Sequence, residues 1–422
     1  MSAAPVRIVV VGGGFAGLES AFLLRSKLGG RARLTLVSDR DRFLFKPNTI
    51  YIPFGGKLDP LLIPLARPAG KREIELVSGR VGGVDPDARR VEVDGRSLDY
   101  DFLVLATGAG MAPEEIPGLP EHAETIWTPE AMASLGRKLA EAIVNARRGE
   151  QQAILFTVPP GNKCSGPLYE IVLMAETYLR RQKVRDRFEL VWATYEQTFI
   201  QAFGPKLHEV VVPEFAKRGI SGNTDWVLER VTDSAAHFGN GETVAFDLLV
   251  AFPPYVAAVR YEGLPQDERG FLKTELDSRR VEGQERIYAP GDAGDFPVKQ
   301  AFLAFLQGDA TAEAIASPWR KARNAAQAFD PVSMCVMEEF DRATFAQVPL
   351  TVTGDPLRPV AVRAGADDAY KVGVSPMWRI GKKMLGIYLP FRFRAGQPFH
   401  AGPPWRAMEL GLKGMSAALA RR

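Results

Sequence analysis

The most reactive side chains in this chain of 422 residues are its only two cysteines, Cys164 and Cys335. Neither has another cysteine or a histidine close by in sequence, so the pattern contains no zinc or iron–sulfur motif and we expect no metal. Two interpretations remain: a pair of inert thiols or one redox pair. Because 171 positions separate the cysteines (335 − 164), only tertiary folding can bring them together.

An intact dinucleotide-binding loop lies near the N-terminus. Gly12, Gly14 and Gly17 follow a β-branched strand at residues 7–11 and precede a helical pattern at 18–28. Glycines at this spacing permit a tight turn and let a pyrophosphate approach bare backbone at the helix N-terminus. The loop therefore predicts nucleotide binding, and a glycine-rich turn without a ligand is the alternative.

The residue that closes the second strand of such a βαβ unit usually bonds the adenosine ribose. Here the second strand, 33–37, is followed by Ser38 and Asp39, and either side chain is a candidate for that role. Neither residue is basic, which argues against a 2′-phosphate on the nucleotide.

The loop around Cys164 stands where a second dinucleotide-binding loop is expected. When Glu170 is set against Glu19, the three positions that correspond to the fingerprint glycines are occupied by Lys163, Ser165 and Leu168. A pyrophosphate needs bare backbone at those positions. We infer that this second site has lost its nicotinamide nucleotide and offers a thiol in its place.

The order of strands and helices predicts an α/β fold with two Rossmann-like βαβ domains, the second inserted in the first. The second unit has strands at 153–158 and 189–193 around a helix at 168–181, and its second strand is followed by no acid before Glu196. We expect a discontinuous first domain, an inserted degenerate domain and a C-terminal domain, with boundaries at 1–112 and 246–320, 113–245, and 321–422.

Composition excludes several classes of protein. The chain has 53 basic and 50 acidic residues, which is too balanced for a nucleic-acid surface, so we expect no nucleic acid as partner. The segment 1–5 is short and polar and runs directly into a strand, so we predict no signal peptide and a location on the cytoplasmic side. No apolar run reaches the roughly 18 to 20 residues of a membrane-spanning helix, which leaves peripheral membrane contact.

The C-terminal segment mixes aromatic and basic residues. Residues 404–422 have helical apolar spacing that places five side chains on one face, namely Trp405, Met408, Leu412, Met415 and Leu419. One interpretation is a dimer or domain interface. The other is an amphipathic helix on a membrane, with its basic residues facing phosphates, namely Arg406, Lys413, Arg421 and Arg422.

Two further motifs resemble those of two-dinucleotide flavoproteins. A buried strand at 99–105 ends in Ala106, Thr107 and Gly108, and a strand at 286–289 runs into Gly291 and Asp292. The resemblance implies that FAD is the cofactor and that Asp292 bonds its ribityl chain. It makes 1–112 and 246–320 the FAD-binding domain.

Together with Gly12 to Glu19 and Cys164 to Pro167, these motifs resemble the sulfide:quinone oxidoreductase family over nearly the whole chain. The chain is also similar to the flavoprotein of flavocytochrome c sulfide dehydrogenase and to type II NADH dehydrogenases. Family members that oxidise sulfide carry one cysteine in the second loop and another in the C-terminal third, as Cys164 and Cys335 do.

The resemblance implies roles for other residues. Glu170 is implied as a proton relay, with a helix-end carboxylate as the alternative, Lys299 as a cation near the flavin, and Pro47 as backbone beside the isoalloxazine. Binding of FAD is expected to be non-covalent, because no cysteine lies near residues 40–50. Many family members have a third cysteine after the Gly108 turn, and this chain has none there.

We therefore expect an FAD enzyme that oxidises sulfide, or a related persulfide or thiol, through Cys164 and Cys335 and reduces a membrane quinone. The quinone is expected near Tyr388, Phe391 or Phe393, and the membrane contact in the C-terminal region. The alternatives are a soluble sulfide dehydrogenase that reduces cytochrome c, a type II NADH:quinone dehydrogenase, and a non-catalytic flavin-binding sensor. A homo-oligomer is an open possibility.

Overall fold

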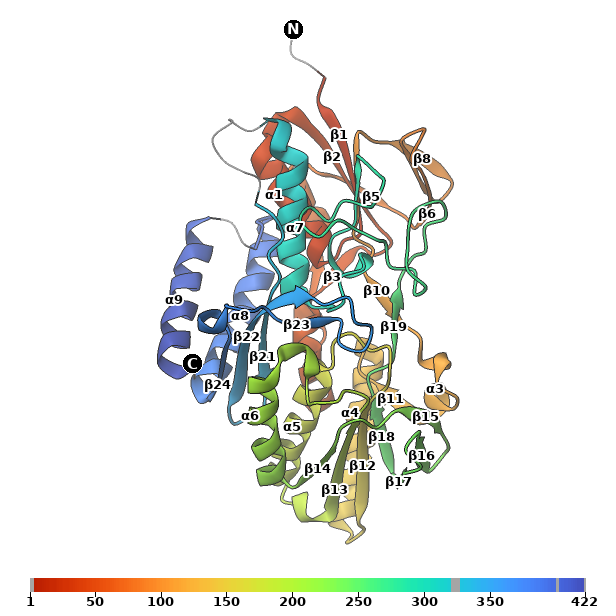
Figure 1. The fold of residues 1–422 in the computed structure, drawn as a ribbon, viewed down its shortest axis with the longest axis vertical. Coiled ribbons are helices and arrows are strands. Elements are labelled where there is room, and N and C mark those ends of the chain that lie inside the picture. Colours follow the sequence, from red (N-terminus) through yellow and green to blue (C-terminus); the bar gives the residue numbers. More distant parts are fainter. Residues whose placement is uncertain (1–3, 320–326, 400–401, 421–422) are drawn as a thin grey trace.

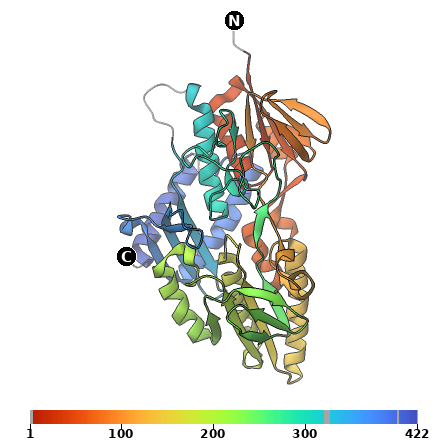
Figure 2. The same ribbon diagram turned by 45° about the vertical axis from the view of Figure 1, so that its right-hand side comes forward.

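The computed structural model describes residues 4–319, 327–399 and 402–420. Figure 1 shows two sheet-centred α/β units stacked along the long axis, with the C-terminal elements packed along one side of both. The rotated view in Figure 2 shows the same arrangement. The fold class predicted from the sequence is confirmed: both α/β units are built on parallel sheets.

The first unit contains a five-stranded parallel sheet in the order β20-β9-β1-β2-β5. Its strands are β1 (Val6–Val11), β2 (Ala32–Ser38), β5 (Glu75–Ser78), β9 (Phe102–Leu105) and β20 (Ile287–Tyr288). Residues 8–11 of β1 and 103–105 of β9 are almost completely buried, as expected for strands covered on both faces. Helices α1 (Phe15–Leu28) and α7 (Ala301–Ala316) pack against each other beside this sheet.

The second unit contains a five-stranded parallel sheet in the order β11-β18-β12-β13-β14. Its strands are β11 (Ala123–Thr125), β12 (Gln152–Val158), β13 (Phe188–Thr194), β14 (Ile220–Asn223) and β18 (Leu248–Ala251). The accompanying helices are α4 (Pro129–Arg147), α5 (Gly166–Arg181) and α6 (Pro205–Arg218). α5 begins directly after the Cys164 loop, so the predicted second βαβ unit is present as β12-α5-β13.

The chain crosses between the two units twice, through a two-stranded antiparallel ribbon of β10 (Ala109–Met111) and β19 (Tyr255–Ala257). The expected return to the first domain at residue 246 is too early, because β18 pairs with β12 in the second sheet. A short apolar strand such as β18 fits either parallel sheet equally well, so its sequence could not specify which sheet it joins.

The C-terminal part consists of an antiparallel sheet followed by two helices. Strand β22 (Ala343–Val352) pairs antiparallel with β21 (Val332–Glu338), β23 (Val360–Val362) and β24 (Lys371–Ser375). Two helices follow, α8 (Pro376–Arg394) and α9 (Pro403–Leu419), and they lie beside each other in both ribbon views.

The apolar face of α9 is turned toward the protein. Leu412 and Met415 pack against the cluster formed by Phe345 and Trp378, and Trp405 packs on Phe399 with a ring separation of 4.5 Å. These contacts argue against lipid contact by Trp405, Leu412 and Met415, three of the five residues on the predicted face, whereas Leu419 near the end of the helix is 36% exposed. Arg421 and Arg422 lie outside the described residues.

Shorter elements complete the units. The remaining strands and helices are β3 (Arg42–Leu44), β4 (Leu62–Pro64), α2 (Ala66–Lys71), β6 (Val81–Asp85), β7 (Arg90–Val93), β8 (Arg96–Asp99), α3 (Leu119–His122), β15 (Leu228–Val231), β16 (Ala235–Phe238) and β17 (Thr243–Ala245).

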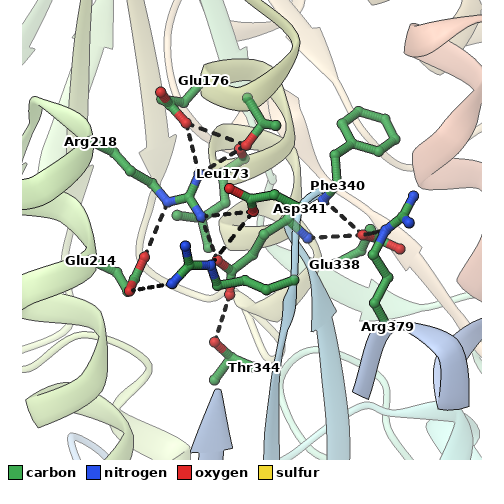
Figure 3. A network of polar contacts seen from close by, with 12 residues as sticks. Leu173, Glu176, Glu214, Arg218, Glu338, Phe340, Asp341, Thr344 and Arg379 are labelled. Atoms are coloured by element: carbon green, nitrogen blue, oxygen red, sulfur yellow. Dashed lines mark hydrogen bonds and ion pairs between the residues drawn. The ribbon is translucent and has the colours of Figure 1, made fainter. Parts of the chain in front are cut away.

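A buried ionic network fastens the second unit to the turn between β21 and β22 (Figure 3). Arg218 at the end of α6 bonds Glu176 of α5 at 2.7 Å, Glu339 at 2.7 Å and Asp341 at 3.1 Å. Glu339 is fully buried, and burial raises its pKa to about 7 despite the guanidinium. Arg218 therefore compensates carboxylates from α5 and from the turn between β21 and β22.

We expect Arg218→Met to lower the free energy of unfolding by about 3 to 5 kcal/mol, because buried carboxylates lose their counter-ion. The pKa of Glu339 is higher in the folded protein than in the unfolded chain. Its protonated form therefore stabilises the fold at low pH, and this contribution is lost as the pH rises through about 7. The deficit of the variant should therefore grow between pH 6 and pH 8. Urea denaturation at both pH values measures it, and an equal deficit at both would contradict the assignment to Glu339.

Candidate active site

The first glycine loop is built for close backbone contact. Gly12 has φ of +116°, and a Cβ there would lie 2.2 Å from the Ala106 carbonyl oxygen. A Cβ on Gly17 would lie 1.9 Å from the Gly12 carbonyl oxygen. These positions hold the loop tightly between β1, β9 and α1, and only glycine fits them.

Gly14 precedes the first residue of α1, and a Cβ there would meet no protein atom within 4 Å. The N-terminus of the helix is thus open to an anion. At the end of β2, the Ser38 hydroxyl donates to the Arg40 carbonyl at 2.8 Å, while Asp39 is exposed. Both stay candidates for the ribose.

The turn after β9 lies beside this loop. The Ala106 amide donates to the Val11 carbonyl at 2.7 Å, which ties the ends of β9 and β1 together. Thr107 accepts a hydrogen bond from the Tyr261 hydroxyl at 3.3 Å, and Gly108 has φ of +78°. The three residues predicted from the flavoprotein-like motif therefore share one edge of the first sheet with Gly12.

A cluster of charged side chains lies where the first sheet meets α7. The Gly291 amide donates to the Gln307 side chain at 2.9 Å, which fixes the turn that carries Asp292. Burial raises the pKa of Asp292, and the nearby ammonium groups of Lys299 and Lys46 oppose this shift. Burial lowers the pKa of both lysines to about 7, and Asp292 opposes that shift.

Lys299 is held firmly in this cluster. Its ammonium donates to the Gly294 carbonyl and lies 3.9 Å from the centre of the Phe271 ring. Its amide donates to the Lys163 carbonyl at 3.1 Å, which joins it to the cysteine loop. The lysine predicted to lie near the flavin is therefore within the same site as Cys164.

Lys46 is a site residue that sequence reasoning did not assign. It begins the 3₁₀ segment 46–54, next to Pro47, and its ammonium lies 2.9 Å from the centre of the Trp127 ring. The only signal for it in the sequence was its position directly before Pro47, which the family resemblance implies beside the isoalloxazine.

These features fit FAD. The open helix N-terminus after Gly14 suits a pyrophosphate, and the partly buried Asp292 presents a carboxylate that no described side chain hydrogen-bonds. Gly12, Gly17 and Gly108 supply the tight backbone, and Lys299 and Lys46 supply positive charge. When bound, FAD provides a two-electron acceptor at this site.

The Cys164 loop is positioned by Asn162, whose side chain is buried. Its amide nitrogen donates to the carbonyls of Phe252 and Pro253 at 2.9 and 3.2 Å, and its oxygen accepts from the Cys164 amide at 2.8 Å. The loop is also bound to the interdomain ribbon, because Tyr255 donates its amide to the Gly161 carbonyl at 3.0 Å. The fold thus fixes the cysteine at the N-terminus of α5.

The second cysteine reaches the same place from β21. A Cβ built on Gly166, two residues after Cys164, would lie 3.9 Å from the Cys335 sulfur. Both cysteines are free thiols and partly exposed. Burial raises the pKa of Cys335 to about 12 and raises that of Cys164 as well, and each thiol is affected by the neighbouring carboxylate of Glu170.

Glu170 lies in α5 one turn beyond the loop and is buried. It accepts the Glu338 amide at 2.7 Å and the ammonium of Lys382 from α8. Burial raises its pKa, and Lys382 opposes the shift. The carboxylate predicted as a relay is therefore an ion-paired group between the two cysteine-bearing elements and α8.

A carboxylate of the protein lies where the sequence predicts a degenerate nucleotide site. Glu196 accepts hydrogen bonds from Ser165 at 3.2 Å, from Thr194 at 3.0 Å and from the Gln201 amide at 3.0 Å. Burial raises its pKa to about 7. Glu196 thus engages the residue that replaces the second glycine of the fingerprint, in a place where a nucleotide phosphate would be repelled.

The three aromatic residues expected near the quinone have different surroundings. Phe391 is 65% exposed on α8, and Tyr388 is partly exposed. Phe393 is buried and packs against Phe15 and Phe43, with a ring separation of 5.0 Å to Phe43. Phe393 is therefore part of the core around the first loop, and only Tyr388 and Phe391 remain accessible candidates.

Comparison with known proteins agrees with this geometry. Residues 6–145 match the family model of pyridine nucleotide-disulphide oxidoreductases. Sulfide-quinone reductase of Aquifex aeolicus is 30% identical over 226 residues, which are 52% of this chain and 50% of that protein. The crystal structure of sulfide:quinone oxidoreductase from Aquifex aeolicus superposes with a TM-score of 0.83 at 21% identity, covering 97% of this chain and 96% of that one.

The chain is a flavoprotein related to the sulfide:quinone oxidoreductases. The mitochondrial sulfide:quinone oxidoreductase of Mus musculus is a more distant relative, 23% identical over 310 residues, 70% of this chain and 67% of that protein. The sequence match to the Aquifex aeolicus relative spans half of its length, whereas the fold likeness spans nearly all of it. FAD is the cofactor of the present chain.

No helix within 4–319, 327–399 and 402–420 is long and apolar enough to cross a membrane. No group of three or more histidine, cysteine or acidic side chains in the same ranges is arranged to hold a metal ion.

We expect Gly17→Val to abolish retention of FAD, because any Cβ at this position collides with the Gly12 carbonyl and displaces the loop. Flavin absorbance per mole of purified protein measures the effect. Gly30→Ala is the matched control, since a Cβ there meets no atom within 4 Å. Full flavin content in Gly17→Val would show that this loop does not hold the cofactor.

Proposed function

We propose that the protein is an FAD-dependent enzyme that oxidises sulfide, or a related persulfide or thiol, through Cys164 and Cys335, and transfers the electrons to a membrane quinone. The observation that carries the proposal is the convergence of the chain's two cysteines. Cys335 lies against Gly166 in the loop of Cys164, and that loop is bonded to Lys299 beside Asp292.

The chemistry needs both sulfurs. In the oxidised pair, hydrosulfide attacks one sulfur of the Cys164–Cys335 disulfide, the S–S bond breaks, and a persulfide forms on one cysteine while the other becomes a thiolate. Two-electron oxidation of the persulfide and the thiolate then joins them through the added sulfur as a trisulfide, with loss of the persulfide proton. The net change is HS⁻ to sulfur, a proton and two electrons, and a quinone takes up two electrons and two protons to become the quinol.

The protein's own groups assist this exchange. Asn162 fixes the Cys164 backbone, and the Gly166 amide faces the Cys164 sulfur and favours its thiolate. Lys299 and Lys46 place positive charge where electrons arrive, and Glu170 lies within reach of both thiols as a proton acceptor. The carboxylate of Glu196 at the second site favours a sulfur donor over a nicotinamide nucleotide as the source of electrons.

We expect Cys335→Ser to abolish bleaching of the flavin by sulfide under anaerobic conditions, since the hydroxyl cannot complete the sulfur pair. Flavin absorbance after addition of sulfide, and then of NADH, is the measurement. Ser333→Ala on the same strand is the control, because it removes a buried hydroxyl that bonds Gln300 and leaves both sulfurs in place.

Bleaching of Cys335→Ser at the rate of the unchanged protein would overturn the cysteine mechanism. Rapid bleaching by NADH in the unchanged protein would instead support a type II NADH dehydrogenase. Reoxidation of the reduced protein by a quinone analogue tests the acceptor, and reoxidation by cytochrome c alone would support the soluble alternative.

A membrane surface is supported by α8 and not by the apolar face of α9. Five exposed apolar side chains follow each other at spacings of three and four along α8, namely Met377, Ile380, Met384, Ile387 and Phe391, with exposures of 48%, 51%, 61%, 75% and 65%. Such a stripe matches one helical face. Lys383 and Arg394 are exposed on the same helix, as expected for contact with lipid phosphates. The cytoplasmic side remains a prediction, as does a homo-oligomer.

We expect Ile387→Glu to reduce binding to anionic lipid vesicles by about tenfold or more, because it places a charge in the centre of the apolar stripe. Vesicle co-sedimentation measures binding, and bleaching by sulfide should be unchanged. Leu357→Glu is the control, since Leu357 is 74% exposed in the loop before β23. Unchanged vesicle binding together with loss of a dimer in Ile387→Glu would make the stripe a contact between copies.

A further inference from the structure

The inner face of α8 reaches the cysteine strand through Lys382. Its ammonium donates to the Val336 carbonyl at 2.7 Å, and Val336 directly follows Cys335. The same ammonium donates to Glu170 of α5. Lys382 is thereby held between the two elements that carry the cysteines, although it comes from the helix whose outer face is the apolar stripe.

Both members of this ion pair are largely removed from water. The side chains of Lys382 and Glu170 are 11% and 8% exposed. Interactions between charges are less screened in such surroundings than at a surface, so both charges act strongly on a nearby thiol. The ammonium of Lys382 bonds the residue after Cys335 and so lies close enough to lower the pKa of that thiol.

The charges that face Cys335 are few. α5 contributes Glu170, α8 contributes Lys382, and the loop before α5 contributes the Cys164 thiol. Further along β21, Glu338 is paired with Arg379 of α8. On the other sides, β22 places Ala346 opposite Cys335, and Gln300 before α7 bonds the Met334 carbonyl. Glu170 disfavours the thiolate of Cys335 and Lys382 favours it.

We propose that Lys382 is a positioning residue of the sulfur site, held by Glu170 and the Val336 carbonyl so that its ammonium stabilises the thiolate of Cys335. This inference rests on the proposed function only in one respect, namely that the thiolate of Cys335 takes part in sulfur exchange. Thiolates are the nucleophiles and leaving groups of disulfide exchange, and a neighbouring cation favours the thiolate over the thiol.

The test uses a background in which one thiol remains. Cys164→Ser leaves Cys335 as the only cysteine of the full-length protein, so its alkylation by iodoacetamide can be followed by mass spectrometry across a range of pH. Removing the negative charge with Glu170→Gln should lower the pKa of Cys335 and accelerate alkylation near pH 7 by about tenfold, the effect of one pKa unit.

The decisive comparison adds changes at Lys382 to the Glu170→Gln protein. Lys382→Met should reverse the acceleration, whereas Lys382→Arg should retain it, because arginine keeps the positive charge. Lys382→Gln keeps a donor for the Val336 carbonyl and provides the same comparison if the methionine variant does not fold. Thermal melting of each variant shows that the fold is intact.

Alkylation of the Glu170→Gln, Lys382→Met protein at the rate of Glu170→Gln alone would overturn the proposal, as would loss of the acceleration in the arginine variant. Neither sulfide nor quinone enters this assay. A protein in which sulfide fails to bleach the flavin but the alkylation pattern appears would retain the role of Lys382 and lose the proposed function.

Discussion

The close approach of β21 to the N-terminal end of α5 is the constraint on which the site depends. It brings the Cys335 sulfur to within 3.9 Å of a Cβ position on Gly166. Two features make this approach possible: a glycine at the start of the helix, and buried polar contacts that draw the strand in. The Glu338 amide donates to Glu170, and Arg218 binds Glu176 of α5 together with Glu339 in the turn after β21. Without these contacts two carboxylate-rich elements would repel each other.

The packing of β21 against α5 also accounts for the thiol that lies where the sequence predicts a second nucleotide site. α5 still starts where a phosphate-binding helix starts, but its N-terminal turn now faces a thiol, and Glu196 engages the adjacent Ser165. A helix N-terminus favours negative charge in either case, whether on a phosphate or on a thiolate. The architecture is thus retained while the partner of the helix changes.

Helix α8 has two roles on its two faces. Trp378 stacks on Phe345 with a ring separation of 4.1 Å, and Arg379 bonds the buried Glu338 at 2.8 Å, so the inner face belongs to the core. The outer face exposes apolar residues without a partner in the described chain. A helix fixed so firmly on one side can present a surface to lipid while it contributes a cation to the sulfur site.

Sequence alone determined the elements that depend on local pattern. The GxGxxG spacing between a β-branched strand and a helix identified β1-α1-β2, and the missing glycines at Lys163, Ser165 and Leu168 marked the altered second loop, because both signals lie within about 30 residues. Tertiary structure decided what requires contacts distant in sequence. It placed β18 in the second sheet, turned Leu412 and Met415 of α9 inward, and brought Lys46 to Asp292 and Lys382 to Glu170. An apolar helical face has the same sequence pattern whether protein or lipid covers it. The partner of a buried charge is distant in sequence and is brought to it only by folding.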